Sequence, residues 1–169
     1  MKIVIAGAGE VGSHLAKMLS GEANEITVID ERQERLDALS TTCDAITVEG
    51  NPSAIKVLHD AGVENADLFI AVNPSESQDV NIVSAMLAKK MGSKKATARI
   101  NNEEYLSYEN KYMFTEMGID LMFYPEKIAA NEIVDLLKRT AATDSMDFAR
   151  GKLQVAVFKL EEDSQLLGM

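Results

Sequence analysis

Three glycines near the start of the chain have the residue type and spacing that can bind a phosphate. They form the pattern Gly7-x-Gly9-x-x-Gly12 within IVIAGAGEVGSHLAKML. Between a strand and a helix, Gly7 permits a tight turn, Gly9 lets the backbone approach a phosphate, and Gly12 lets the helix pack closely on the strand. The pattern alone is weak, so its meaning depends on the elements around it. The candidate ligand contacts in this turn are Gly7, Ala8, Gly9, Glu10, Val11 and Gly12.

An acidic residue follows at the place where a ribose would lie. Asp30 ends the second strand-like run, and a carboxylate there accepts hydrogen bonds from the ribose hydroxyls of adenosine. It would also repel a 2′-phosphate, which favours NAD-type or simple adenine nucleotides over NADP, although Arg32 and Arg35 nearby weaken that preference. Glu31 and Arg32 are included as candidate contacts. The alternative is a purely structural glycine turn, with Asp30 capping the next helix.

The elements that position these residues are read from hydrophobic periodicity. Short apolar or β-branched runs alternate with segments whose apolar residues recur at intervals of three and four, which predicts βαβ units. Two such helical stripes are Val11, Leu15 and Met18, and Val80, Val83 and Leu87. Gly92 and Gly118 stand where two helices would end. The six strand-like runs are 2–6, 25–30, 45–48, 67–72, 96–100 and 119–123.

This alternation predicts an α/β fold, namely a Rossmann-like, doubly wound parallel sheet of six strands in the order 3-2-1-4-5-6. In such a sheet the ligand lies at the carboxyl ends, where strands 1 and 4 diverge. We therefore expect Ala71, Val72 and Asn73, after strand 4, to line the cleft, and Asn51, after strand 3, to border the adenosine side. Arg99 ends strand 5 and could bind a phosphate or a neighbouring carboxylate. Its alternative role is that of a surface cation.

Composition excludes several other classes of protein. Seventeen basic residues against 27 acidic ones give a net charge of −10, which argues against nucleic acid as the main partner. No apolar run is long enough to span a bilayer, so we expect a cytoplasmic chain that does not itself insert into the membrane. The single cysteine, Cys43, can form no internal disulfide, and no Cys/His cluster has metal spacing. The only two histidines, His14 and His59, are better explained as solvated or satisfied side chains than as catalytic bases.

From residue 1 to about 139 the chain resembles the KTN or RCK_N family. These are the N-terminal nucleotide-binding domains of TrkA-type regulatory subunits in bacterial Trk potassium uptake systems, and they are related to the gating-ring domains of potassium channels. The segments that carry the resemblance are MKIVIAGAGEVGSHLAKMLS, ITVIDERQERLDAL, VEGNPSAIKVLHDAGVENADLFIAV and NIVSAMLAKKMGSKKATARINNEEY. The chain departs from the family at two places. The acid-acid-x-Asn after strand 4 is Gln78-Asp79-Val80-Asn81, and the frequent Gly-Asp after strand 3 is Gly50-Asn51.

The resemblance implies that the nucleotide is an effector and not a reagent. It implies NAD or NADH, with ATP and ADP as further candidates, bound by Gly7 to Val11, Asp30, the region of Asn73, and Arg99. It also implies a membrane potassium-translocating, TrkH-like partner that holds the chain at the inner face of the membrane, and no enzymatic activity. The alternative from another class is the cofactor half of an NAD-dependent oxidoreductase.

The segment YPEKIAANEIVDLLKRTA predicts a helix with an unusually broad apolar surface. In the family the last helix crosses to a partner subunit, which implies a homo-oligomer, either a dimer or a higher ring; the alternative is a helix packed on its own sheet. We expect residues 1–140 to form the nucleotide-binding domain, with this helix at about 125–140. Residues 141–169 would be a linker and the truncated start of a C-terminal lobe. The apolar positions of the helix are Ile128, Ala129, Ile133, Leu136, Leu137 and Thr140.

Overall fold

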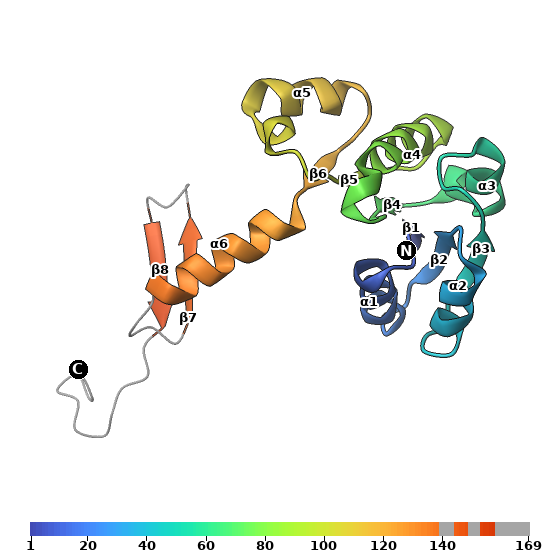
Figure 1. Ribbon diagram of the computed structural model, residues 1–169, viewed down its shortest axis with the longest axis horizontal. Helices are drawn as coiled ribbons and strands as arrows, with labels where there is room; N and C mark the ends of the chain where they lie inside the picture. The colour runs from blue at the N-terminus through green and yellow to red at the C-terminus, as the bar shows by residue number, and fades with distance from the viewer. Residues whose placement is uncertain (139–143, 149–152, 158–169) are drawn as a thin grey trace. The chain divides into compact units, whose positions relative to one another are not determined.

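The computed structural model describes residues 1–138, 144–148 and 153–157 and groups the chain into two compact units, Met1–Pro125 and Glu126–Met169. The first unit contains a six-stranded sheet in the order β3-β2-β1-β4-β5-β6, and every pair is parallel (Figure 1). This order confirms the predicted doubly wound sheet, and each strand lies within about two residues of its predicted bounds. The strands are β1 Lys2–Ala6, β2 Glu25–Asp30, β3 Ile46–Glu49, β4 Leu68–Ala71, β5 Ala96–Arg99 and β6 Leu121–Phe123.

Helices connect the strands and cover both faces of the sheet. The α-helices of this unit are α1 Glu10–Ser20, α2 Gln33–Ser40, α3 Ile55–Asp60, α4 Gln78–Met91 and α5 Tyr108–Glu116. Three short 3-10 helices, η1 Val63–Asn65, η2 Ser75–Ser77 and η3 Glu103–Leu106, lie in the connections. Gly92 caps the end of α4 and Gly118 follows α5, both with positive φ, as the sequence predicted.

Alternate side chains of the central strands enter two separate cores. Val4 and Ala6 of β1 pack in a cluster with Leu58 of α3 and with residues of α4 and α5. Ile3 and Ile5 of the same strand pack in a second cluster with residues of α1 and α2. Parallel strands that are covered on both faces read as continuous apolar runs, which explains why the sequence located them well.

The predicted apolar stripes of α1 and α4 are wrong at one position each. Met18 is 62% exposed and Val83 is 45% exposed. The buried residues of these helices are mostly small. Small side chains let each helix lie close to the strands. The buried residues are Gly12 and Ala16 in α1, and Asn81, Ser84, Ala85 and Ala88 in α4.

The second unit contains α6 Pro125–Lys138 and an antiparallel pair, β7 Asp144–Phe148 with β8 Leu153–Val157. α6 begins at the predicted residue, and Thr140 lies outside the described residues, as does most of the predicted linker and lobe. The compact units divide after Pro125, and the predicted domain bounds 1–140 and 141–169 stay a prediction. Among the residues that the structure describes, no helix combines the length and apolar character needed to cross a bilayer.

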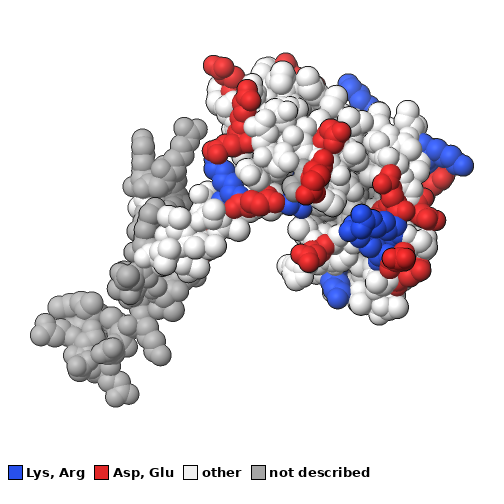
Figure 2. Space-filling view, viewed as in Figure 1, with Lys and Arg blue, Asp and Glu red and all other residues white. Residues whose placement is uncertain are grey.

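Acidic and basic side chains are interspersed on the face of the first unit that Figure 2 shows. Lys2 and Glu25, the first residues of β1 and β2, form an ion pair with 3.2 Å between the Lys2 Nζ and the Glu25 Oε1. Most such exposed pairs contribute little to stability. The charge pattern therefore bears on solubility and partner choice more than on the fold.

Candidate nucleotide-binding site

The glycine turn joins the end of β1 to the start of α1. Gly7 has a φ of +111°, and its N–H donates to the Ile29 carbonyl at 2.7 Å. A Cβ on Gly7 would lie 2.9 Å from the backbone nitrogen of Asn73, and a Cβ on Gly12 would lie 1.8 Å from the Gly7 carbonyl oxygen. No side chain fits at either position, so α1 lies directly against the turn. Two of the three glycines therefore have the geometric roles that the sequence predicted.

Gly9 has a different surrounding, because the space beside it is open. A Cβ on Gly9 would meet only the Arg35 Nη1, at 3.8 Å. Gly9 is also the residue before the first turn of α1, where backbone N–H groups lack helical partners and the helix dipole favours an anion. A phosphate could approach the backbone here.

Asp30 is the anchor of the turn as well as the predicted ribose acceptor. Its carboxylate is almost fully buried, its Oδ2 accepts from the Ala8 N–H at 2.7 Å, and its Oδ1 accepts from the Arg32 N–H at 2.9 Å. The Arg35 Nη1 lies 3.5 Å from the Oδ2. Each carboxylate oxygen has two acceptor positions, so the Ala8 and Arg32 N–H groups leave one position on each oxygen, and the Arg35 guanidinium stands beside the one on the Oδ2. The structural role and the binding role of Asp30 are therefore compatible.

A cleft of about 430 Å³ lies at the carboxyl end of the sheet, beside the turn. Its volume falls in the range of small-molecule sites. It lies where β1 and β4 diverge and the order of strands reverses, which is the usual ligand position in such sheets. Residues from α1, α2, the end of β4 and the end of β5 come together in it. They are Gly9, Glu10, Val11, Arg35, Val72, Pro74, Glu76 and Arg99.

The other predicted site residues do not line this cleft, and these include the buried Asp30 and, in the turn, Gly7, Ala8 and Gly12. Ala71 is fully buried in the core, and Asn73 is half-buried behind Gly7. Asn51 lies after β3, where its Oδ1 accepts from the N–H and the hydroxyl of Ser53. Glu31 and Arg32 are exposed at the end of β2.

Asn81 was not among the predicted ligand contacts, but it holds the loops of this site together. It is fully buried, and its Oδ1 accepts from the Asn73 N–H at 2.9 Å and from the Asn73 Nδ2 at 3.0 Å. Its own Nδ2 donates to the Asn73 carbonyl at 3.2 Å and to the Arg99 carbonyl at 3.1 Å. Asn81 therefore ties together the ends of β4 and β5. The sequence did contain a clue, because the polar Asn81 lies on the same buried side of α4 as Ser84, Ala85 and Ala88.

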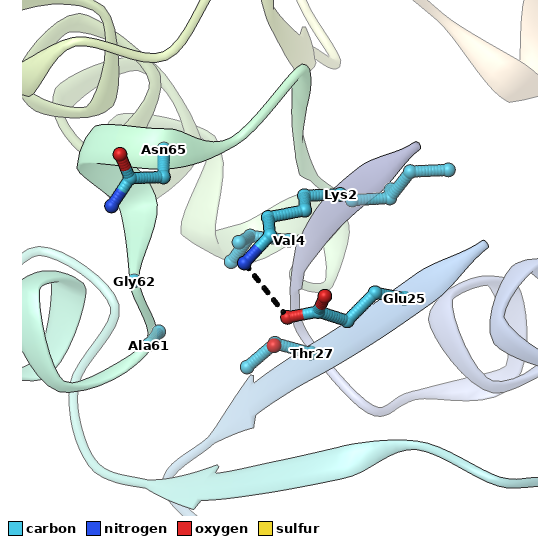
Figure 3. A pocket seen from close by; sticks show the side chains of 8 residues that line it. Lys2, Val4, Glu25, Thr27, Ala61, Gly62 and Asn65 are labelled. Carbon is cyan, nitrogen blue, oxygen red and sulfur yellow. Dashed lines mark ion pairs between the residues drawn. The ribbon is translucent and has the colours of Figure 1, made fainter.

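The opposite, amino edge of the sheet offers less to a nucleotide. Figure 3 shows a pocket of about 70 Å³ between the starts of β1 and β2 and the segment around Gly62 and Asn65. That volume is well below the range of small-molecule sites. A larger groove of about 470 Å³ lies nearby, but its charged lining residues are the carboxylates Glu25 and Asp44, which would repel phosphate.

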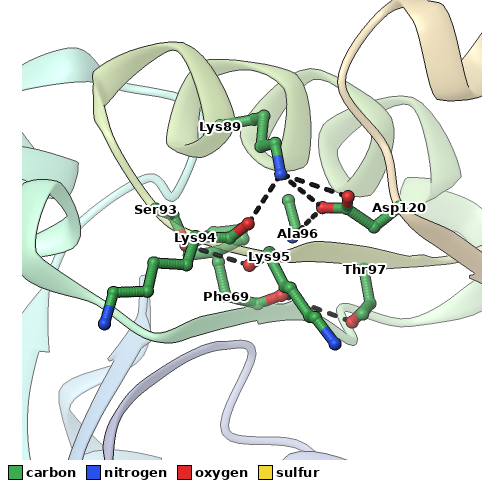
Figure 4. A network of polar contacts seen from close by, with 8 residues as sticks. All are labelled: Phe69, Lys89, Ser93, Lys94, Lys95, Ala96, Thr97 and Asp120. Carbon is green, nitrogen blue, oxygen red and sulfur yellow. Dashed lines mark hydrogen bonds and ion pairs between the residues drawn. The ribbon is translucent and has the colours of Figure 1, made fainter.

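An ion pair between Lys89 and Asp120 lies at the same edge of the sheet, near β5 and β6. The Lys89 Nζ lies between the Lys94 carbonyl and the Asp120 carboxylate, at 2.7 and 2.9 Å, and the Asp120 Oδ2 also accepts from the Ala96 N–H (Figure 4). Burial raises the pKa of the Asp120 carboxyl, but the hydrogen bonds from Lys89 and Ala96 outweigh burial and hold that pKa below its usual value. This edge is a structural tie between α4 and the strands.

The fold and the cleft together define a class, that of Rossmann-like domains whose glycine turn and strand ends can hold a nucleotide. A family model, the TrkA-N domain, matches residues 3–125. The chain therefore belongs to the TrkA-N domain family. No group of three or more His, Cys, Asp or Glu side chains in the described part of the chain is placed to hold a metal ion.

Curated relatives extend over the whole chain. It is 36% identical over 170 residues to the Trk system potassium uptake protein TrkA of Haemophilus influenzae, and 35% identical over 170 residues to the TrkA homolog of Archaeoglobus fulgidus. Each match covers 99% of this chain and 37% of the relative. The chain thus spans little more than a third of these potassium uptake proteins.

Solved structures share the fold at lower identity. The TrkA-N domain of the inner membrane protein YbaL from Escherichia coli superposes with a TM-score of 0.67 at 22% identity, over 80% of this chain and 96% of that one. The GsuK RCK domain superposes with a TM-score of 0.63 at 24% identity, over 82% of this chain and 28% of that one. These matches support the same Rossmann-like architecture.

Adding one methyl group at Gly12 should be strongly destabilising. In Gly12→Ala the new Cβ would overlap the Gly7 carbonyl oxygen, so α1 must move away from β1. We expect a loss of about 3 kcal/mol in the free energy of unfolding, measured by denaturant titration followed by circular dichroism. Gly21→Ala is the matched control, because its nearest neighbour would be the Met18 carbonyl at an ordinary 3.7 Å. Equal stability of the two variants would contradict the packing described.

Replacing Asn81 should weaken the fold more than replacing its neighbour in the same turn of α4. Asn81→Leu leaves the Asn73 amide and the Arg99 carbonyl without their buried partner, which should cost about 3 kcal/mol in the free energy of unfolding. Gln78→Leu loses one exposed bond, from the Asn101 N–H, and should cost less than about 1 kcal/mol. Denaturant titration compares the two, and a smaller effect at Asn81 would contradict the assigned network.

Proposed function

We propose that this chain is the nucleotide-sensing domain of a regulatory protein for potassium uptake. Its ligand is NAD or NADH, with ATP and ADP as further candidates. Ligand binding changes the conformation of the domain, and a membrane potassium-translocating, TrkH-like subunit responds to that change. The observation that carries the proposal is the open Gly9 face at the start of α1, where the Arg35 side chain links the turn to the Asp30 carboxylate and Arg99 lines the same cleft. This is an anion-compatible turn beside a ribose acceptor.

Each part of the ligand has a matching group on the chain. The Asp30 carboxylate would accept from the ribose hydroxyls, and the backbone at Gly9 and the first turn of α1 would face the phosphates. Arg99 lines the same cleft and would supply positive charge. Proteins of similar fold have been solved with nucleotides, the GsuK channel with NAD at a TM-score of 0.58 and the Kef C-terminal domain of Shewanella denitrificans with AMP at 0.57.

We favour regulation over catalysis. Among the described residues, the cleft lining includes no His, Cys, Lys or Tyr, and its candidate general bases are the exposed carboxylates Glu10 and Glu76. The curated relatives are potassium uptake proteins. The alternative, the cofactor half of an NAD-dependent oxidoreductase, would require a catalytic domain elsewhere in a longer protein.

Coupling to a partner requires that the ligand bind two arrangements of the assembly unequally. α6 is suited to form such an assembly. Its side chains Ile128, Ile133, Leu136 and Leu137 are each more than half exposed, which is unusual for one helix. We propose a homo-oligomer, a dimer or a higher ring, through the helix at 125–140. In this account the assembly lies in the cytoplasm, at the inner face of the membrane, held there by its partner.

Loss of the ribose acceptor should remove nucleotide binding. In Asp30→Ala the affinity for NAD, NADH, ADP and ATP should fall at least about tenfold, because charged hydrogen bonds to the ribose are lost. Calorimetric titration measures the affinity, and thermal unfolding checks that the variant is folded. Asp37→Ala, on the exposed side of α2, is the control. Unchanged affinity in Asp30→Ala would contradict the assigned site.

Charge on the apolar side of α6 should dissociate the oligomer. The double variant Ile133→Glu, Leu137→Glu places two carboxylates one turn apart where apolar burial is expected, so its mass in solution should fall to that of one chain. Asn131→Glu, on the polar side of the same helix, should leave the mass unchanged. Light scattering coupled to size exclusion gives the mass. A wild type that is already monomeric at all concentrations would refute assembly through this helix.

A further inference from the structure

Arg35 lies between the two parts of the proposed site. It comes from α2, and its Nη1 is 3.5 Å from the Asp30 Oδ2 on one side. On the other side, the same nitrogen is 3.8 Å from the position of a Cβ on Gly9. Its side chain is about a third exposed, and it lines the cleft. The guanidinium therefore touches the ribose acceptor and borders the open phosphate turn.

The free acceptor positions of Asp30 are few. The Oδ2 already accepts from the Ala8 N–H, and the Oδ1 already accepts from the Arg32 N–H. Two acceptor positions then remain, one on each oxygen, which matches the two hydroxyls of a ribose. Arg35 stands beside the Oδ2, so a ribose that uses both positions must displace the guanidinium from it.

The contact between Arg35 and Asp30 is loose enough to exchange. At 3.5 Å it is longer than a charge-assisted hydrogen bond, which measures about 2.7–2.9 Å. The turn at Gly9 is within reach of the same side chain, and the cleft already holds two carboxylates, Glu10 and Glu76. A bound phosphate would add further negative charge, and a guanidinium binds phosphate oxygens in a fork.

We propose that Arg35 is an exchangeable counter-ion that selects phosphorylated ligands. It faces Asp30 in the structure described here, and it transfers to the phosphate when a ribose takes its place on Asp30. A nucleoside displaces Arg35 and brings no phosphate for it to bind, so it binds more weakly than a nucleotide. This inference rests on the proposed function and assigns the specificity for nucleotides over nucleosides to one side chain.

The test compares two ligands that differ only in phosphate. Wild type and Arg35→Gln are titrated by calorimetry with ADP and with adenosine. For Arg35→Gln we expect affinity for ADP to fall about tenfold, because a charged partner of the phosphate is lost. We expect affinity for adenosine to rise about threefold, because a weak ion pair no longer competes for Asp30. Lys17→Gln is the matched control, since Lys17 is exposed in the last turn of α1 and does not line the cleft.

Opposite shifts for the two ligands support the exchange. Any other result overturns it, whether the two affinities shift in the same direction, only one of them shifts, or neither does. Arg35→Lys keeps the charge and guards against misfolding of the first variant; it should lose less ADP affinity than Arg35→Gln and bind adenosine as the wild type does, and loss of both ligands would overturn the exchange. A wild type that binds neither ADP nor NAD would refute the proposed function itself, which separates the two failures.

Discussion

The close approach of α1 to the end of β1 is the constraint on which the candidate site depends. At Gly12 the helix touches the Gly7 carbonyl, and at Gly7 the turn touches the backbone of Asn73 after β4. Three segments, the turn, α1 and the end of β4, are thereby fixed relative to one another without any side chain between them. Gly9 remains the open position of the turn, and the first amides of α1 face the space beside it. The same turn thus excludes side chains at Gly7 and Gly12 and leaves space for an anion at Gly9.

Polar side chains then hold the two edges of the sheet in different ways. At the amino edge, Lys89 and Asp120 satisfy each other and the start of β5. At the carboxyl edge, Asp30 and Asn81 bind backbone groups of the loops that surround the cleft, and Asp30 keeps acceptor positions in reserve. A buried polar group is costly unless it is paired, so groups with reserve capacity mark the edge at which a ligand would complete the pairing.

Much of this arrangement follows from the sequence, for physical reasons that also explain the errors. The strands were predictable because both faces of the sheet are covered, and their order followed from right-handed crossovers between parallel strands. The roles of Gly7 and Gly12 followed from their spacing. Met18 and Val83 were misassigned because α1 and α4 pack through small residues, which carry little hydrophobic signal.

Two side chains of the site required the structure. The partners of Asn81 include the Arg99 carbonyl, 18 residues away in the sequence, and no local pattern predicts such a contact. From the sequence, Arg35 was only a nearby positive charge that weakened the inferred preference for NAD over NADP. In the structure it lies in the cleft, beside the Asp30 carboxylate. Long-range pairing decides such positions, while periodicity decides the elements that carry them.

A crystal structure of this chain grown with NAD would test the central claim most directly. The account predicts the adenosine ribose on the Asp30 carboxylate and a phosphate against the backbone of Gly9, in the cleft that Val72 and Arg99 also line. A nucleotide bound at the amino edge, beside Lys2 and Asn65, or a chain that crystallises without NAD when the nucleotide is in large excess, would contradict it.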